Sequence, residues 1–127
     1  MDSRMERFRA ERERLNELVC STDDLNVKRF FALDAAVYRE GALPARVKEL
    51  LGLAASLVLR CDDCIAYHVD RCFAEGVTRP EFDEAAAVAL VVGGSVVIPH
   101  LRRARDLWEE LSREEGRGRG EGGSGTS

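Results

Sequence analysis

The chain has 127 residues, of which 45% are hydrophobic and 33% charged, a balance typical of one globular domain rather than a disordered or fibrous protein. Its formal net charge is -4, and the arginines at 102, 103 and 105 alternate with nearby acids, so we expect no nucleic acid partner. The apolar runs are shorter than the roughly 20 residues that a membrane-spanning helix needs, so we expect no membrane partner.

The first segment predicts an amphipathic packing helix over residues 3–19, where Met5, Phe8, Leu15 and Val19 recur at helical intervals among charges. Because this segment lacks the apolar core of a secretory signal, we expect a cytoplasmic, reducing location. Four cysteines in such a location are more often reactive, metal-bound or buried than joined in structural disulfides.

A second helix is predicted within residues 22–41. The threonine or aspartate that opens this range can cap exposed backbone N–H groups, and the glycine that closes it can end the helix. Phe30, Leu33 and Val37 are expected to form the stripe that faces the core.

Two further helices are predicted next, and the second carries a cysteine pair. Pro44 suits the first turn of a third helix because its missing N–H has no partner there, and no breaker follows before Arg60. Asp62 and Asp63 suit the positive end of a fourth helix, which ends at Gly76. The "CDDC" pair therefore opens a helix.

A fifth helix is predicted to begin at Thr78, which forms a capping-box pattern with Glu81. The Gly93-Gly94 pair breaks the segment before a last helix that runs through Trp108.

These elements predict an all-α fold, with a single domain of five to six helices over residues 1–115 and a flexible Gly-rich tail over residues 116–127, because no stretch shows strand alternation. Two of the helices are apolar nearly all round, more than a monomer of this size can cover. We therefore expect subunits to pack together.

Four candidate metal or redox ligands, Cys61, Cys64, His68 and Cys72, fall on one face of the fourth helix. One tetrahedral zinc ion cannot bind all four, because the outer sulfurs lie roughly 16 Å apart along the axis. His100 is the only other histidine in the chain and no second CxxC pair exists, so we expect no metal site.

The CxxC pair at a helix start favours dithiol chemistry. Its short loop allows a disulfide between Cys61 and Cys64, and the partial positive charge of the helix N-terminus stabilises a thiolate. The position of Cys61 nearer that N-terminus predicts that it is the more exposed sulfur. Two packing cysteines are the alternative interpretation.

His68 lies one turn beyond Cys64, about 6 Å along the axis, where its imidazole could take the thiol proton. A half-buried structural histidine is the alternative. Glu49 could hold that imidazole in one tautomer. On an unbroken helix it would point about 120° away from Cys61, so the pairing requires a bend near Arg60.

Residues 44–98, which include "KELLGLAASLVLRCDDCIAYH", resemble the carboxymuconolactone decarboxylase superfamily, specifically its alkylhydroperoxidase D-like branch. That branch has a glutamate, a CxxC that starts twelve residues later, and a histidine four residues beyond the second cysteine. Glu49, Cys61, Cys64 and His68 match each of these positions. The resemblance implies a helical fold that assembles as a homotrimer or homohexamer, and no bound cofactor.

The resemblance also implies a thiol-dependent hydroperoxidase. In that chemistry Cys64 is oxidised to a sulfenic acid, Cys61 closes a redox disulfide and meets other thiols, and Glu49 with His68 relays protons. The partners would be a hydroperoxide or other small molecule and a dithiol or protein thiol reductant. One departure is Asp63, where the best-known members have histidine. Together with its neighbour at position 62 it is expected to disfavour the thiolate.

Three alternatives stay open. A disulfide oxidoreductase would pass electrons to a partner thiol protein. A lactone decarboxylase would use His68 and Glu49 as acid and base without thiols. A helical oligomerisation module would leave the cysteines inert. Cys20 and Cys72 receive no role, and Tyr67 and the remaining histidine are expected to be structural.

Overall fold

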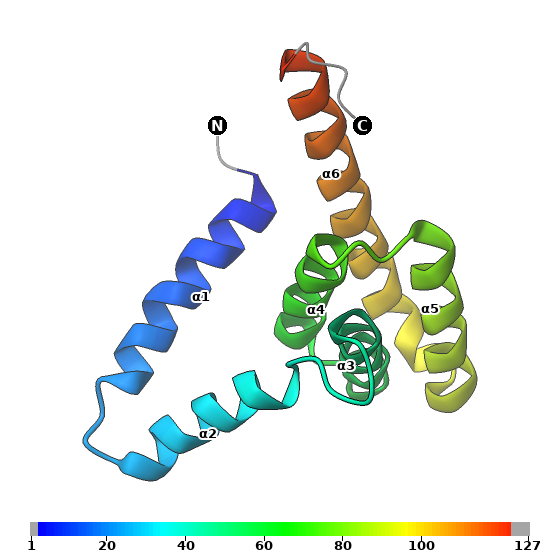
Figure 1. Ribbon diagram of the computed structural model, residues 1–127. Coiled ribbons are helices and arrows are strands. Elements are labelled where there is room, and N and C mark those ends of the chain that lie inside the picture. Colours follow the sequence, from blue (N-terminus) through cyan, green and yellow to red (C-terminus); the bar gives the residue numbers. More distant parts are fainter. Residues whose placement is uncertain (1–2, 123–127) are drawn as a thin grey trace.

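The computed structural model describes residues 3–122, with side chains described for residues 3–116. Every regular element within residues 3–122 is helical and no strand occurs there, which confirms the predicted all-α class (Figure 1). The elements in chain order are α1 (Arg4–Cys20), α2 (Leu25–Val37), α3 (Ala45–Leu59), α4 (Asp62–Ala74), α5 (Arg79–Gly93), the short 3-10 turn η1 (Ser95–Val97) and α6 (Ile98–Gly122).

Side-chain oxygen atoms cap the start of three helices, α1, α2 and α5. Ser3 and Glu6 exchange side-chain and backbone hydrogen bonds at the start of α1, and Thr78 and Glu81 form the predicted capping box at the start of α5. The cap of α2 is Asp24, one residue beyond the predicted positions, and it accepts two backbone N–H groups of the first turn. These bonds satisfy donors that a helix start leaves unpaired.

Two boundaries differ from the sequence prediction. Helix α2 ends at Val37 rather than at Gly41, because the Lys48 ammonium from α3 donates to the Val37 carbonyl oxygen at 2.8 Å. Pro44 has extended backbone and stands just before α3 instead of inside its first turn. Either position leaves its missing N–H without cost.

The predicted bend near Arg60 is present. Arg60 has φ 59° and ψ 41°, and within residues 3–122 it is the only residue other than glycine with positive φ. This left-handed conformation ends α3 and sends the chain back, so that α4 packs along α3. The turn is what allows residues of α3 and α4 to face each other.

The hydrophobic core lies among α3, α4, α5 and α6. Leu53 and Leu57 of α3 and Val69 of α4 are fully buried, and the ring of Phe82 lies 4.9 Å from that of Trp108. Close packing of this kind fixes the register of α3 against α4. The two helices that carry the motif residues are therefore held by the best-packed part of the chain.

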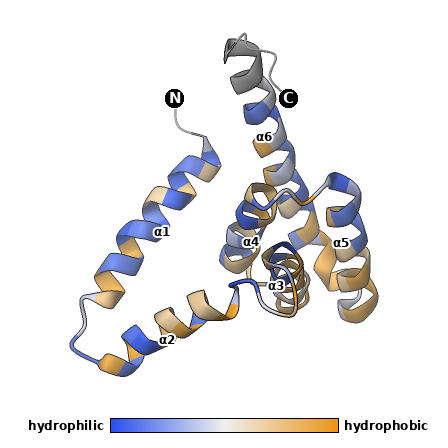
Figure 2. Cartoon of the chain, in the orientation of Figure 1, coloured by the Kyte–Doolittle hydropathy of each residue, from blue (hydrophilic) through white to orange (hydrophobic). Residues whose placement is uncertain are grey.

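Helices α1 and α2 lie to one side of this body as a V-shaped arm (Figure 1). The prediction that Phe30, Leu33 and Val37 face the core is wrong, because they are 68%, 59% and 53% exposed. In the single chain α2 extends away from the body, and its apolar residues stand in the open (Figure 2). A surplus of apolar surface is therefore present, as the composition of the helices led us to expect.

The C-terminal helix is longer than predicted. Backbone helix continues to Gly122, so the predicted flexible tail over residues 116–127 is helical in its first part, and residues 123–127 lie outside the described residues. Each residue added to an existing helix gains one hydrogen bond, which lets α6 continue into a Gly-rich segment. No helix of the described residues is long and apolar enough to cross a membrane.

Candidate active site

The CxxC pair stands where α4 begins. Cys61 is the capping residue with extended backbone, and Cys64 lies in the first turn. The two sulfurs form a disulfide with 5.3 Å between the Cα atoms, inside the ordinary range for this bond. The Cys61 sulfur also accepts the backbone N–H of Cys64 at 3.3 Å. The pairing expected from sequence is thus geometrically available.

Access to the two sulfurs is the reverse of the sequence prediction. Cys64 is exposed, whereas Cys61 is only half-exposed. A capping side chain folds back over the N–H groups of the first turn, and this places the Cys61 sulfur against its own helix. Cys64 is therefore the sulfur that a molecule from solution meets first in the single chain.

Glu49 and His68 form a buried pair across the two helices. The His68 Nδ1 atom lies 2.9 Å from the Glu49 Oε1 atom, and both side chains are buried. An ionised carboxylate accepts a hydrogen bond from Nδ1–H, which leaves the lone pair of neutral imidazole on Nε2. This arrangement is the one that a carboxylate-oriented base requires.

The second oxygen of Glu49 faces Arg71, a residue that the sequence analysis missed. Arg71 Nε lies 4.0 Å from Glu49 Oε2, and the same guanidinium donates to Glu75 at 2.8 Å. Arg71 follows His68 by three residues on α4, the spacing at which helical side chains share a face. That spacing was a usable signal for a positive charge near the buried carboxylate.

Gly52 makes room for the imidazole. A Cβ atom at this position would lie 2.6 Å from His68 Cε1 and 2.9 Å from each ring nitrogen, closer than real Cβ contacts allow. Gly52 lies three residues after Glu49 on α3, on the same face. The imidazole therefore packs directly on the backbone of α3, with the carboxylate one turn before it.

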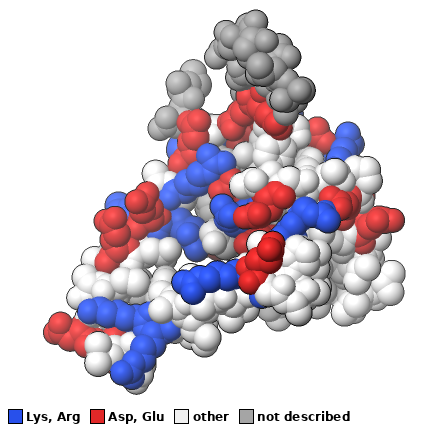
Figure 3. Space-filling model, in the orientation of Figure 1, with Lys and Arg blue, Asp and Glu red and all other residues white. Residues whose placement is uncertain are grey.

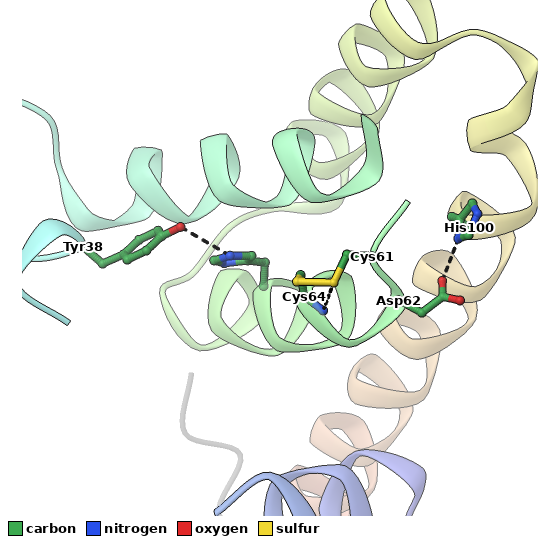
Figure 4. Close-up of a disulfide and its surroundings, with 6 residues drawn as sticks. Tyr38, Cys61, Asp62, Cys64 and His100 are labelled. Atoms are coloured by element: carbon green, nitrogen blue, oxygen red, sulfur yellow. Dashed lines mark hydrogen bonds and ion pairs between the residues drawn. A yellow bond between two sulfur atoms is a disulfide. The ribbon is translucent and has the colours of Figure 1, made fainter. Parts of the chain in front are cut away.

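Two tyrosines contact the His68 ring. Tyr67, which we expected to be structural, packs edge-on with the ring centres 5.2 Å apart. Tyr38, from the end of α2, places its hydroxyl 3.4 Å from His68 Nε2 (Figure 4). Nothing in the sequence marked Tyr38, because it lies 30 residues from the histidine and outside the motif.

A cavity of about 410 Å³ opens beside the disulfide, between α1, α2 and α4. Cys64 and His68 both line it, and α1 supplies the opposite wall with Phe8 and Leu15. The charged lining consists of Glu11, Arg12, Asp34 and Asp63. A small molecule in this cavity would meet the exposed sulfur and the base together, and three carboxylates against one guanidinium make the surroundings acidic.

The two aspartates between the cysteines have different surroundings. Asp62 turns toward α6, where its carboxylate lies 2.8 Å from His100 Nδ1 and 3.2 Å from Arg103 Nη2 (Figure 4). The hydrogen bond from His100 and the Arg103 charge lower the pKa of Asp62. Asp63 lines the cavity instead. The Asp62 charge is therefore offset by partners of its own, and the expected effect of the two carboxylates on a thiolate stays a prediction.

The two other cysteines stand apart from the disulfide. Burial raises the pKa of the Cys72 thiol to about 12, so this thiol stays protonated at neutral pH. Cys20 is half-buried near the end of α1. Among the described residues, no group of three or more histidine, cysteine or acidic side chains is arranged to hold a metal ion.

Comparison with known proteins places this geometry in a family. A model of the carboxymuconolactone decarboxylase family matches residues 26–109, most of the chain. An uncharacterized protein of Cupriavidus necator is 36% identical over 77 residues, which are 61% of this chain and 68% of that protein. The resemblance inferred from the motif is thus confirmed, and it agrees with the alkylhydroperoxidase D-like branch.

Solved structures give the same result. A crystal structure from Thermotoga maritima superposes with a TM-score of 0.85 at 58% identity, covering 88% of this chain and 95% of that one. It is described as a carboxymuconolactone decarboxylase family protein "possibly involved in antioxidative response". A family member from Legionella pneumophila has a TM-score of 0.76 at 24% identity, covering 87% and 99% of the two chains, and shares the fold.

Proposed function

The chain belongs to the carboxymuconolactone decarboxylase family, and we propose that it is a thiol-dependent hydroperoxidase of the alkylhydroperoxidase D-like kind. The observation that carries this proposal is the Cys61–Cys64 disulfide at a cavity that also exposes the base of a buried Glu49–His68 pair. The antioxidative description of the Thermotoga maritima relative supports it.

In the first half of the reaction, the Cys64 sulfur attacks the outer oxygen of the hydroperoxide while His68 takes the thiol proton. The O–O bond breaks, the proton goes to the departing oxygen, and water or an alcohol leaves with Cys64 as a sulfenic acid. The Cys61 sulfur then attacks the sulfur of that sulfenic acid and forms the disulfide. The hydroxide that it displaces takes up the Cys61 thiol proton and leaves as water. The dithiol has given two electrons and the disulfide remains.

In the second half, a reduced dithiol or protein thiol resets the enzyme. Its thiolate attacks the exposed Cys64 sulfur, and Cys61 leaves as a thiolate. A second thiol of the reductant then attacks the reductant's own sulfur in this mixed disulfide, which forms the oxidised reductant and releases Cys64 as a thiolate. The cap position supports this order, because the leaving sulfur already accepts the N–H of Cys64 and lies at the positive end of α4. We assign the cycle to a reducing cytoplasmic setting, where such thiols are available.

The test is the consumption of cumene hydroperoxide by reduced protein with an excess of dithiol. We expect turnover by the wild type, none by Cys64→Ser, and slower turnover by Cys61→Ser, in which the added dithiol must reduce the Cys64 sulfenic acid directly. Cys20→Ser is the matched control, because Cys20 is a free, half-buried cysteine on α1 outside the CxxC pair. Wild-type turnover in both CxxC variants would end the proposal.

A second candidate is a disulfide oxidoreductase that exchanges electrons with a partner thiol protein. The exposure of Cys64 favours it, because a protein thiol can reach this sulfur without entering the cavity. Trapping without peroxide separates the two candidates. An oxidoreductase predicts that Cys61→Ser holds a stable mixed disulfide with an oxidised partner through Cys64, whereas a peroxidase alone predicts none until peroxide has oxidised Cys64. A mixed disulfide that forms only through Cys61 in Cys64→Ser would contradict the order of attack given above.

The assembly belongs to the proposal as well. We propose a homotrimer or homohexamer, since large apolar side chains of α2 and α5 are exposed in the single chain. The α5 residues are Val88, Val91 and Val92, at 59%, 87% and 69% exposure. Light scattering during gel filtration tests this, and a monomer at micromolar concentration would contradict it.

A further inference from the structure

The Tyr38 hydroxyl contacts Nε2, the nitrogen through which His68 would act as a base. Glu49 accepts a hydrogen bond from His68 Nδ1–H, so the lone pair of neutral His68 is on Nε2, and the hydroxyl of Tyr38 lies 3.4 Å from that nitrogen. With the imidazole neutral, the Tyr38 hydroxyl donates to Nε2. Figure 4 shows the Tyr38 side chain directed into the site, with the disulfide beyond.

The backbone around Tyr38 is anchored to the helix that carries Glu49. The Lys48 ammonium donates to the carbonyl oxygens of Val37 at 2.8 Å and Arg39 at 2.7 Å, the residues on each side of Tyr38. Lys48 directly precedes Glu49 on α3. Two neighbouring residues of α3 therefore act on the two sides of the imidazole. Glu49 contacts Nδ1 directly, and Lys48 anchors the backbone of Tyr38, whose hydroxyl contacts Nε2.

We propose that Tyr38 is a positioning residue that competes with the reactive thiol for the His68 Nε2 lone pair, and so restrains the base. This rests on the proposed function for the role of His68. A hydrogen bond to the neutral imidazole stabilises that form over the protonated one and makes proton transfer from the thiol less favourable. A bond of 3.4 Å is long, so the thiol can displace it at modest cost.

The other groups around His68 do not take the place of the Tyr38 hydroxyl at Nε2. Tyr67 packs against the same ring without a hydrogen bond. The titratable and charged groups that face the imidazole or its carboxylate are Glu11 and Arg12 from α1, Asp34 from α2, Glu49 from α3, and Asp63, Cys64, Tyr67 and Arg71 from α4. Of all these groups and Tyr38, only Tyr38 forms a hydrogen bond with Nε2.

The experiment measures the rate at which iodoacetamide alkylates Cys64 in reduced protein between pH 5.5 and 8. We expect Tyr38→Phe to react about two- to tenfold faster than the wild type on the acid side of this range, the factor that one hydrogen bond supplies. Tyr67→Phe is the matched comparison and should not reproduce the acceleration. In a His68→Gln background, Tyr38→Phe should change nothing.

A structural role for Tyr38 would give the opposite result, because a loosened imidazole slows alkylation. An unchanged or slower rate in Tyr38→Phe, equal acceleration in Tyr67→Phe, or acceleration that persists in the His68→Gln background would each overturn the proposal. The readout is thiol reactivity and needs no peroxide. If the wild type fails to consume peroxide, the proposed function is rejected. The alkylation rates of the Tyr38→Phe and Tyr67→Phe variants still decide the proposal about Tyr38.

Discussion

Two histidine–carboxylate pairs flank the same cysteine motif. His68 and Glu49 lie 2.9 Å apart in the interior, and His100 and Asp62 lie 2.8 Å apart near the surface. The distances are nearly equal, but the Asp62 side chain is 52% exposed and the Glu49 side chain 5%. Geometry alone therefore does not distinguish a candidate catalytic pair from a structural one.

Burial and neighbours make the difference. Water can form hydrogen bonds with the Asp62 carboxylate, which also contacts Arg103. The Asp62–His100 pair therefore joins the start of α4 to α6 but contributes little to the free energy of unfolding. Glu49 has no such exchange with solvent, and its charge must be met by His68 and Arg71. A buried carboxylate fixes the imidazole strongly, whereas an exposed one does not.

The surface of the molecule supports the same distinction. Acidic and basic side chains are interspersed over the face drawn in Figure 3, where ion pairs are common and individually weak. The Asp62–His100–Arg103 group resembles these pairs. The Glu49–His68 pair differs because its histidine lines the cavity that Cys64 also lines.

The largest expected effect is the loss of the buried carboxylate. Glu49→Gln should lower the rate of peroxide reduction about 100-fold, because the amide no longer stabilises a protonated imidazole. Asp62→Asn, the same change in the exposed pair, should stay within about threefold of the wild type. Stopped-flow kinetics on reduced protein measures both, and equal losses would erase the distinction between the pairs.

The next largest effect is expected from filling the space that Gly52 leaves beside the His68 ring. Gly52→Ala places a methyl group 2.6 Å from the His68 ring, and we expect a loss of about 1–3 kcal/mol in the free energy of unfolding together with reduced activity. Gly116→Ala on α6 is the control, since its Cβ meets no atom within 4 Å. Urea denaturation that gives both variants wild-type stability would contradict this packing.

The burial of Cys72 leads us to expect a smaller free energy of unfolding at alkaline pH. Burial raises the pKa of its thiol from the ordinary 9.0 to about 12, so the unfolded chain loses this proton first as the pH rises. Stability is fully present below pH 9 and declines toward pH 12, by about 1 kcal/mol at pH 10. Cys72→Ala should flatten the unfolding free energy over this range, and an unchanged slope would count against the burial of the thiol.

The smallest effect concerns the exposed pair at acid pH. The pKa of Asp62 is lowered, so its contribution to stability is present above the ordinary value of 3.8 and is lost as the pH falls below it. Asp62→Asn should slightly reduce the acid sensitivity of thermal unfolding between pH 5 and pH 2. A large change in the melting temperature at neutral pH would mean that this pair matters more than its exposure implies.

Sequence patterns predicted what is local. Capping residues, the break at the glycine pair and the motif of Glu49, Cys61, Cys64 and His68 depend on spacings of one to a few helical turns. The bend at Arg60 could be inferred only because the motif needed it. Each of these features is encoded within one helix or, for the motif, within two consecutive helices and the turn between them.

Contacts between distant helices could not be predicted in the same way. The hydroxyl of Tyr38 and the fit of Gly52 under the ring depend on how α2 and α3 are placed against α4. The outward stripe of α2 was misassigned because periodicity shows that a face is apolar, not what it faces. The partners of Asp62 were missed for a related reason, since they come from α6.

The most direct measurement of the central claim is a single turnover with fully reduced protein and one equivalent of cumene hydroperoxide, followed by peptide mass spectrometry. The account predicts that one peroxide consumes two thiols and leaves a Cys61–Cys64 disulfide, at a rate that falls steeply in Glu49→Gln and little in Asp62→Asn. Peroxide that remains while both thiols stay reduced would contradict it.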